Sequence, residues 1–537
     1  MPAPDVAVSR VAVPLAAVAG VPLLVVVTLA ERSGAGTSHA AVTVSGGATP
    51  VTSRVVRVYP RRSIRVGVVV TPRAGGRLVL TARAVAARDA DRSNDAAVVG
   101  VRVLDAAVAP SRPLVEGFAG FGAQFNHHVY AGLSRDAGVS DDNVGDMEEK
   151  VTALRPQLVR LFFTRTAFAD RDRMQSFVRT AQLAQRTGAT INVTWQTSHG
   201  SNLEVELPLF ADVLASLVLD AGVSNLRWVT LQNEVNRTSI TMETYDRMYR
   251  IVASRIAERG LGHHVRLMGG DLVEQRSPLG QTQGDWLRFL AARMSDVVHA
   301  YSIHVYWNHW SPGKIERRLR EVRALYDTLP PETRKPLYVT EFGARGHRVA
   351  GDGGPGTWDD GSPLEANAIS AFQHAWLKVL ASKLGYAGAI KWDAFFGRYD
   401  ARPQSYHLIG PPQEGWPLRP GYHLTRLLTG TTRAGWRTVA VDGASGTRLI
   451  AAFAGGLGEL TVVGLDTTGA KLNAASPALV PYSIGGLPPR TTFRLLLWNG
   501  DGAGATLEAA PVTADATGIA VLSVPLHAVF ALTTLQP

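Results

Sequence analysis

Two stretches of the chain decide how it is interpreted: residues 228–234, WVTLQNE, and residues 337–343, LYVTEFG. Each is a short apolar run that leads into a glutamate, Glu234 in the first and Glu341 in the second. A carboxylate that follows directly on a buried strand is costly to bury unless it has a partner. Each glutamate therefore needs a reason for its position, and the surrounding sequence indicates what that reason is.

The region around these two stretches alternates between apolar runs and segments of helical period. Short buried strands that alternate with helices are typical of parallel βαβ units. Eight such units in about 300 residues predict a closed (β/α)8 barrel. A doubly wound open sheet is the alternative, and it usually has a glycine-rich loop after its first strand. Residues 117–122, GFAGFG, contain such glycines, but no capped helix follows them at once. The eight runs are Phe118–Phe125, Leu158–Phe163, Thr190–Trp195, Trp228–Gln232, Val265–Gly270, Val298–Val305, Leu337–Thr340 and Gly388–Trp392.

The sequence before the barrel contains an apolar run of nearly membrane length, residues 11–29. A secretory signal would begin with a basic segment, but only Arg10 precedes this run, and proline and glycine interrupt it. Two strands separated by a turn, Val6–Pro14 and Pro22–Leu29, fit better than a signal or an anchor. Alternating residues follow up to residue 103, and residues 4–104 resemble the immunoglobulin-like modules that are often attached to extracellular enzymes.

Short strand-like runs return from about residue 431 to the end of the chain. The predicted fold is therefore α/β: a (β/α)8 TIM barrel flanked by N-terminal and C-terminal all-β sandwich domains. We expect an immunoglobulin-like module at residues 1–105, the barrel at 106–430 and a C-terminal β-sandwich at 431–537. A linker is expected at Asp105–Pro113, because this segment contains two prolines and a serine.

Composition excludes several classes of protein. The 537 residues include no Cys, which rules out a disulfide scaffold, a thiolate zinc site and a thiol nucleophile. The net charge is +10, which is compatible with binding to nucleic acid or to a membrane surface. The basic residues are spread along the chain without a block of five or more, so we predict no nucleic acid partner and no membrane span.

The chemistry of a barrel of this kind lies at the carboxyl ends of its strands. Glu234 follows strand four and Glu341 lies at the end of strand seven, so both are expected at that face. Cleavage of a glycosidic bond requires two such carboxyl groups, one protonated as the acid and the other ionised as nucleophile or base. Different surroundings and mutual repulsion are able to hold their pKa values apart.

With these residues the chain resembles glycoside hydrolase clan A, the retaining (β/α)8 glycosidases. The resemblance rests on Asn233-Glu234 after strand four and on Thr340-Glu341-Phe342-Gly343 at strand seven, and it covers roughly residues 114–430. It implies that Glu234 is the acid/base, that Asn233 contacts the sugar 2-hydroxyl and that Glu341 is the nucleophile. The alternative, two glutamates that cap helices or bridge to arginines, does not explain why both fall at strands four and seven.

Three further residues are predicted to lie beside these carboxylates. Arg160 interrupts the apolar run LVRLFF at 158–163, and its planar fork suits a carboxylate. The resemblance implies that this carboxylate is Glu341; an internal structural salt bridge is the alternative. His304 and Tyr306 are two residues apart on strand six and therefore face the same side. The resemblance also implies that Tyr306 bonds to the nucleophile.

Other residues at strand ends are candidates for contacts to sugar. Trp195, Trp307 and Trp392 offer aromatic faces for sugar rings, with core packing as the alternative, and the resemblance implies that Trp392 forms the floor of the sugar subsite. Asn126, His127 and Asp271 are predicted to bind hydroxyls. The pair His127-His128 also raises the possibility of a metal, but no second ligand cluster has metal spacing. We therefore predict no metal and no cofactor.

These observations predict a retaining glycosidase that cleaves an oligo- or polysaccharide by double displacement, with a carbohydrate as its partner. A transglycosylase with the same site and a non-catalytic carbohydrate-binding or adhesion protein are the alternatives. An aldolase would need a Schiff-base lysine, and the only candidate, Lys391, directly precedes Trp392 and is expected to face away. We expect a secreted or cell-surface protein whose export signal is not present in this chain. The sequence leaves the sugar and the oligomeric state open.

Overall fold

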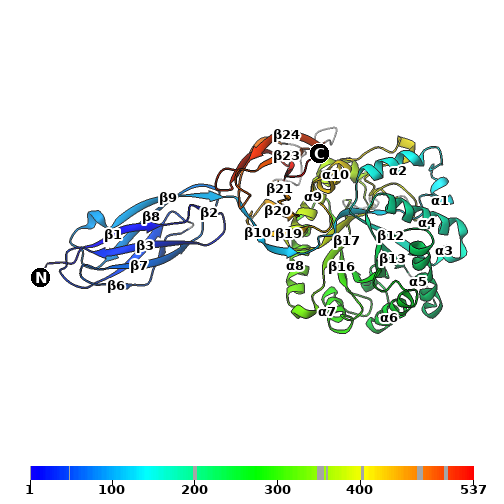
Figure 1. Ribbon diagram of the computed structural model, residues 1–537, viewed down its shortest axis with the longest axis horizontal. Helices are drawn as coiled ribbons and strands as arrows, with labels where there is room; N and C mark the ends of the chain where they lie inside the picture. The colour runs from blue at the N-terminus through cyan, green and yellow to red at the C-terminus, as the bar shows by residue number, and fades with distance from the viewer. Residues whose placement is uncertain are drawn as a thin grey trace.

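The computed structural model describes residues 2–47, 49–196, 202–346, 356–358, 361–400, 404–444, 446–456, 458–468, 476–500 and 506–536. It has three parts (Figure 1). An elongated N-terminal part projects away from the rest, a sheet formed mainly by the C-terminal strands lies in the middle, and a barrel surrounded by helices lies at the other end.

The prediction of an eight-stranded parallel barrel is confirmed. The strands pair in sequence order, and the first strand, β11, pairs with both β12 and the last strand, β18, which closes the barrel. A Cβ at Gly122 in β11 would lie 1.5 Å from the carbonyl oxygen of Leu158, so only glycine permits the close approach of β12 there. The barrel strands are β11 (Gly120–Phe125), β12 (Leu158–Thr164), β13 (Thr190–Gln196), β14 (Leu226–Leu231), β15 (Arg266–Leu272), β16 (Ala300–Asn308), β17 (Leu337–Arg345) and β18 (Gly388–Lys391).

Helices cover the outside of the barrel, and one continuous cluster of buried apolar side chains joins them to the strands. The amphipathic pattern explains this packing; in α4, for example, Phe177, Ala181 and Ala184 are buried on one face. The helices are α1 (Gly132–Arg135), α2 (Val144–Ala153), α3 (Thr166–Ala169), α4 (Arg171–Arg186), α5 (Leu203–Leu219), α6 (Met242–Glu258), α7 (Gln283–Arg293), α8 (Gly313–Asp327), α9 (Ala368–Lys383) and α10 (Pro420–Thr431).

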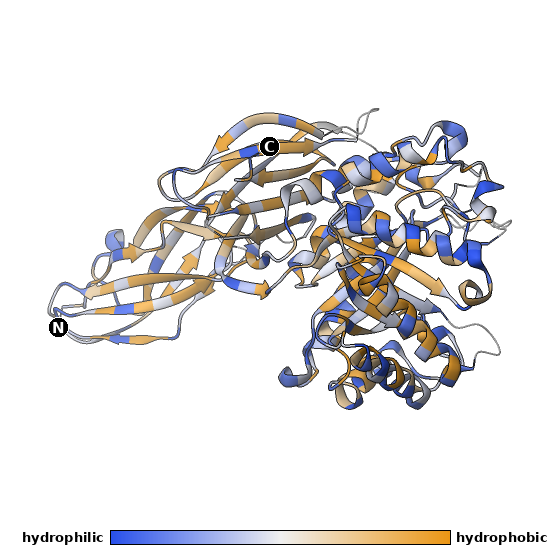
Figure 2. Cartoon of the chain, turned by 45° about the vertical axis from the view of Figure 1, so that its right-hand side comes forward, coloured by the Kyte–Doolittle hydropathy of each residue, from blue (hydrophilic) through white to orange (hydrophobic). Residues whose placement is uncertain are grey.

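The N-terminal part consists of two sheets that share one apolar core. Residues 11–29 contribute strands, as the sequence predicts, and hydrophobic residues alternate with hydrophilic ones along the strands (Figure 2). Among the described residues, no helix combines the length and the apolar character needed to cross a membrane. The strands are β1 (Val6–Ala12), β2 (Ala16–Val18), β3 (Leu23–Glu31), β4 (Ser38–Ser45), β5 (Val51–Thr52), β6 (Val56–Val58), β7 (Ser63–Val70), β8 (Gly76–Ala86) and β9 (Ala96–Leu104).

The middle part is a nine-stranded sheet with apolar residues on both faces. One face, including Phe453 and Val463, packs against the barrel cluster, and the other, including Ile450 and Phe530, forms a separate core. The sheet therefore holds the barrel on one side and its own interior on the other. Its strands are β10 (Ala106–Val115), β19 (Arg437–Gly443), β20 (Arg448–Ala454), β21 (Leu460–Asp466), β22 (Ser476–Gly485), β23 (Thr492–Trp498), β24 (Thr506–Thr513), β25 (Ala520–Leu526) and β26 (Val529–Thr533).

The predicted linker at Asp105–Pro113 is wrong. Residues 106–115 form β10, which pairs with β19 in the middle sheet and lies beside it in Figure 1. The two prolines suggested a loop, but the ladder with β19 shifts register on either side of Pro113, and the partner on the opposite edge, β22, pairs only at Ala106 and Ala107. Proline is tolerated at such irregular and unpaired positions of a strand.

Candidate active site

The carboxyl ends of the barrel strands bring Glu234 and Glu341 together. A carboxylate oxygen of each lies within 4.8 Å of the other and of a ring nitrogen of His304. Their side chains are 12% and 8% exposed, so both are mostly buried but reach the solvent. A cavity of about 310 Å³ opens beside Glu234 and is also lined by Tyr306 and Arg345. The two glutamates of the sequence pattern therefore lie close together, and Glu234 lines the cavity.

The backbone at this edge of the barrel is strained. Gln232 and Glu234, directly after β14, have φ values of 62° and 49°, and Asp271 in β15 has 51°. Such left-handed conformations cost on the order of 1–3 kcal/mol for residues other than glycine and cluster at functional sites. The turn after β14 thus holds Glu234 at a position that a relaxed strand end would not provide.

Arg160 is fully buried and connects four strands. Its guanidinium donates to the Glu341 Oε2 at 2.6 Å, to the Asp271 Oδ2 at 2.5 Å and to the Asn233 Oδ1 at 2.7 Å. The Nε donates to the hydroxyl of Thr194 at 2.8 Å. Because the fork is planar and every bond is charge-assisted or buried, Arg160 fixes the orientation of Glu341 and Asn233 relative to each other. The residue lies beneath the opening, so its contacts are to the protein.

Asp271 does not have the position expected of a sugar ligand. It is fully buried, and its carboxylate accepts from Arg160, Ser302 and Thr340. The predicted hydroxyl contact is therefore wrong. The prediction placed Asp271 at the correct end of the barrel, but the left-handed backbone turns the side chain inward, where burial is offset by the Arg160 charge.

His304 and Tyr306 both face the carboxylates, as their spacing of two indicates. The Tyr306 hydroxyl donates to the Glu341 Oε1 at 2.7 Å. His304 Nδ1 lies 3.4 Å from Glu234 and 3.8 Å from Glu341, and its Nε2 lies 3.4 Å from Asp271. The imidazole is thus surrounded by three carboxylates, and Glu341 has a donor on each oxygen.

The electrostatics of the opening favour an ionised set of groups. Burial acts to lower the pKa of His304, but Glu341, Asp271 and Glu234 outweigh it and raise the pKa to about 9. Burial acts to raise the pKa of Glu234, but His304 and Arg237 outweigh it and lower the pKa to about 2. The pKa of Asp271 is lowered in the same way, by Arg160 and His304 against burial. In the unliganded protein, Glu234 is therefore a carboxylate that faces an imidazolium.

Arg237 is a residue of the site that the sequence analysis missed. Its guanidinium lies 2.5 Å from the Glu234 Oε2 and is about half exposed. The sequence spacing could have identified it, because Arg237 follows Glu234 by three residues and lies in the short turn Val235–Arg237. The guanidinium of Arg345 lies over the Tyr306 ring, 4.7 Å from its centroid. The rim of the opening is thus basic.

Trp392 lies in a cluster of aromatic side chains that includes Tyr306, the partner of Glu341. Its ring stacks on Tyr399, with centroids 4.8 Å apart, and meets the edge of Phe162. His127 is buried with ring contacts to Phe162 and Tyr399, and the Asn126 Oδ1 accepts from the backbone N–H of His128 at 2.9 Å. Burial first, and then the neighbouring His128 and Arg173, hold the pKa of His127 well below its usual value. His127 is therefore neutral at pH 7.

Trp195 and Trp307 are buried, although Trp307 also contributes to the lining of the cavity beside Glu234. Trp195 packs among Phe163, Phe168 and Phe210. Trp307 stacks on Phe342, and its Nε1 donates to Gln373 of α9. The predicted stacking of both on sugar rings is wrong, and the core-packing alternative holds. The physical reason is strand alternation, which places Trp307 opposite to Tyr306.

Glu234, His304 and Glu341 have the donor types of a metal site, with ligand atoms within 4.8 Å of one another. Their surroundings do not suit a cation, since the guanidinium groups of Arg237 and Arg160 already pair with the two carboxylates. A histidine must also be neutral to bind a metal, whereas the pKa of His304 is raised to about 9. These residues therefore fit acid–base chemistry better than metal binding.

Comparison with known proteins gives a likeness of fold. A scan against protein-family models and a search of curated proteins find no match. Among solved structures, the catalytic domain of the GH30 xylanase C from Talaromyces cellulolyticus is 11% identical with a TM-score of 0.55, covering 80% of this chain and 100% of that chain. A glucosidase from Croceicoccus marinus is 13% identical with a TM-score of 0.55, covering 81% and 99%. SrfJ from Salmonella typhimurium is 13% identical with a TM-score of 0.53, covering 93% and 100%.

Proposed function

We propose that the chain is a retaining glycosidase with Glu341 as nucleophile and Glu234 as acid/base. The observation that carries this proposal is the approach of the two carboxylates, which have one oxygen each within 4.8 Å of the other and are both partly exposed to solvent. Retaining enzymes hold the two carboxyl groups about 5–5.5 Å apart, whereas inverting enzymes need about 6.5–9.5 Å to admit a water. The likeness to barrels that include a xylanase and a glucosidase supports the same reaction class.

In the first step, an oxygen of Glu341 attacks the anomeric carbon while the glycosidic bond breaks and Glu234 protonates the leaving oxygen. In the second step, Glu234 removes a proton from water, whose oxygen displaces Glu341 from the anomeric carbon. The hydrogen bonds from Arg160 and Tyr306 hold the attacking carboxylate in place during both steps. Both glutamates thus return to their starting protonation states after each turnover.

Glu234 has to carry a proton before the first step, although its pKa is about 2 in the unliganded protein. Arg237 contributes to that low pKa and is about half exposed, so it is free to move. A leaving group that displaces Arg237 removes a positive charge and some solvent from Glu234, and both changes raise the pKa of a carboxyl group. We infer that substrate binding raises the pKa of Glu234 and so allows it to take up the proton that the first step requires.

Neighbouring groups are positioned to bind the sugar. Because the Asn233 Oδ1 accepts from Arg160, its amide nitrogen is left to donate to the 2-hydroxyl. Trp392, 8% exposed, offers its ring as the floor of the subsite, and His127 contacts Phe162, the ring that packs against Trp392. Asn126 precedes His127 and is assigned to the same subsite. Among the described residues, neither ring nitrogen of His127 has a hydrogen-bond partner, so a sugar hydroxyl would satisfy it.

The two flanking parts extend the proposal to the whole chain. We assign residues 1–105 to an immunoglobulin-like sandwich and residues 431–537, together with β10, to a second sandwich beside the barrel. Accessory β modules beside a glycosidase barrel suit a polymeric carbohydrate outside the cell, so we propose a secreted or cell-surface location. Fractionation of the source cells, with antibody detection of the chain, tests that location.

The test of the reaction is a screen of chromogenic pyranosides, furanosides and polysaccharides with wild type and Glu341→Ala. We expect Glu341→Ala to lose activity on the order of 10⁴-fold or more, because the covalent step is removed. Azide, a small nucleophile that fits the vacated space, should restore turnover and yield a glycosyl azide of inverted configuration. Glu365→Gln, which changes a buried glutamate outside the opening, serves as the matched control. Full activity in Glu341→Ala would contradict the assignment.

A further inference from the structure

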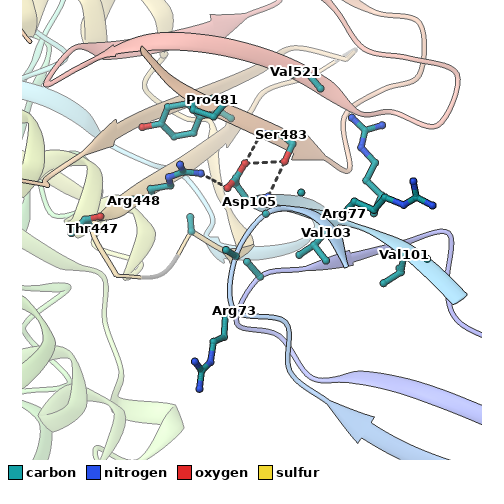
Figure 3. A pocket seen from close by; sticks show the side chains of 18 residues that line it. Arg73, Arg77, Val101, Val103, Asp105, Thr447, Arg448, Pro481, Ser483 and Val521 are labelled. Carbon is teal, nitrogen blue, oxygen red and sulfur yellow. Dashed lines mark hydrogen bonds and ion pairs between the residues drawn. The ribbon is translucent and has the colours of Figure 1, made fainter. Parts of the chain in front are cut away.

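A second cavity lies far from the barrel opening, where the N-terminal part meets the middle sheet (Figure 3). Its volume is about 950 Å³, compared with about 310 Å³ for the cavity beside Glu234. The N-terminal part contributes the loop before β8 and the strands β8 and β9, and the middle sheet contributes β20, β22 and β25. The cavity is therefore built by two parts of the chain together.

The N-terminal wall of this junction cavity concentrates positive charge. Arg77 in β8 and Arg102 in β9 are direct cross-strand partners in an antiparallel pair. Like charges that face each other across strands destabilise a sheet. Arg73, in the loop before β8, also lines the cavity, although its side chain points away from Arg77 in Figure 3. An anion that lies beside the two guanidinium groups would offset this repulsion.

The acidic residues near this wall are already engaged. Asp105, the residue between β9 and β10, accepts from the backbone and the hydroxyl of Ser483 at 2.8 Å each and is ion-paired with Arg448, as the dashed lines in Figure 3 show. Asp515 lies 3.7 Å from Arg102, and both are almost half exposed. Within the described part of the chain, no carboxylate lies within ion-pair distance of Arg73 or Arg77. The wall thus retains excess positive charge.

The wall is shaped around these groups. A Cβ at Gly100 of β9 would lie 3.4 Å from the Arg77 Nε and 3.6 Å from its Nη2, so the guanidinium lies across a strand position that has no side chain. A Cβ at Gly75 would lie 2.6 Å from the Asp105 carboxylate. Pro481 and Val521, from the middle sheet, add apolar surface to the same cavity. Planar cations beside apolar patches suit a ligand that has both anionic groups and C–H faces.

We propose that the junction cavity is a binding site for an anionic oligosaccharide, one that carries carboxylate or sulfate groups. Guanidinium forks bind both groups through paired, charge-assisted hydrogen bonds. The volume lies within the range of about 300–1,000 Å³ that is usual for small-molecule sites. The oligosaccharide part of the assignment rests on the proposed function, whereas the anionic part rests on the arginines alone. A bound chain would contact both parts and hold acidic polymer near the barrel.

The test is calorimetric titration of the full chain carrying Glu341→Gln, which keeps the ligands intact, with three probes. A galacturonic acid trimer supplies carboxylates, a sulfated disaccharide supplies sulfates, and a neutral glucose trimer is the control. We expect an anionic probe to bind roughly tenfold or more tightly than the neutral one. The stronger of the two anionic probes identifies the source of the charge.

Variants locate the binding. Arg77→Ala and the double variant Arg73→Ala/Arg77→Ala should weaken binding of the anionic probe roughly tenfold or more, and Arg77→Lys should weaken it less, because it keeps the charge without the fork. Arg65→Ala, on the exposed face of β7, removes the same charge from the other sheet of the N-terminal part and should leave binding unchanged. Near-native circular dichroism and melting temperature in each variant show that the fold persists.

Three outcomes would overturn the proposal: equal affinity for the neutral trimer, unchanged binding in the double variant, or an equal loss in Arg65→Ala. Tighter binding of a short single-stranded DNA at the same arginines would assign the cavity to another polyanion and would overturn it as well. Hydrolysis of a small chromogenic glycoside by chains with native Glu341 is a separate readout. Failure of the proposed function appears there, and failure of the cavity assignment appears only in the titrations.

Discussion

Buried charges lie on both sides of the barrel wall near β17 and β18, and the two sides differ. On the inner side, Arg160 pairs with Glu341 and Asp271, and the carboxylates of Glu234 and Glu341 reach the solvent. On the outer side, against α9, Glu365 lies 3.0 Å from Lys391, and both are sealed from solvent.

The pKa values of the buried groups are shifted in opposite senses on the two sides, because burial outweighs the ionic partners only on the outer side. On the outer side it dominates, raising the pKa of Glu365 to about 7 and lowering the pKa of Lys378 to about 7. On the inner side, ionic partners overcome it and keep Glu234 and Asp271 ionised. A buried carboxylate alone therefore does not mark an active site. What distinguishes the active site is a set of buried acidic and basic groups that pair with one another, two of whose carboxylates reach the solvent.

The largest effect is expected from removing Arg160, the cation that pairs with the buried carboxylates on the inner side. Arg160→Ala leaves Asp271 and Glu341 buried without their common partner, which should cost about 3–5 kcal/mol of unfolding free energy and most of the activity. Urea unfolding measures the first effect and glycoside hydrolysis the second. Arg237→Ala, which removes a half-exposed partner, is the control and should cost less than about 1 kcal/mol. If Arg160→Ala and Arg237→Ala lost equal unfolding free energy, the buried and the half-exposed arginine would not differ in their contribution to stability, and the comparison would fail.

An intermediate effect is expected on the outer side, and it concerns stability rather than catalysis. Glu365 has a pKa of about 7 in the folded chain against 4.5 in the unfolded one, so it stabilises the fold fully below about pH 4.5 and loses that contribution as the pH rises through about 7. Wild type should therefore lose on the order of 2 kcal/mol relative to Glu365→Gln between pH 5 and pH 7.5.

Urea unfolding of wild type and Glu365→Gln at several pH values measures this difference. At 25 °C the kcat/KM of Glu365→Gln should stay within about twofold of wild type, because the residue touches no substrate. A large loss of activity in the folded variant would mean that the outer cluster takes part in the reaction, and the comparison would fail.

The smallest expected effect sharpens the account of Glu234. Arg237→Gln removes a positive charge beside this carboxylate, so the pKa of Glu234 should rise. The alkaline limb of kcat/KM reports deprotonation of this acid in the free enzyme and therefore begins near pH 2. It should move to higher pH by roughly half to one unit, which raises kcat/KM at any pH above the limb by about three- to tenfold. The pH profile on a substrate with a poor leaving group is the measurement. A shift to lower pH, or none, would show that Arg237 does not control the acid.

The sequence was sufficient to predict the barrel and its two acidic residues, because apolar runs of strand length repeat eight times and two of them lead into glutamate. It was also sufficient to orient Trp307, since His304 and Tyr306 were placed on one side and alternation then puts Trp307 on the other. The stacking role assigned to Trp307 ignored that constraint.

Other features could not be predicted from local pattern. Trp195 ends its strand just as Trp392 does, and only the contact of the adjacent Thr194 with Arg160 shows which side faces the opening. Tyr399 reaches Trp392 from a loop with no periodicity. The strand β10 has two prolines, and its partner β19 lies more than 300 residues further along the chain, beyond the reach of any window of sequence.

That distance has a consequence for biosynthesis. When β10 leaves the ribosome, the strand that will pair with it has not been made, and the entire barrel is translated in between. An unpaired strand edge invites association with other chains. A chain stopped at residue 430 would therefore retain β10 without its two neighbours in the sheet, β19 and β22.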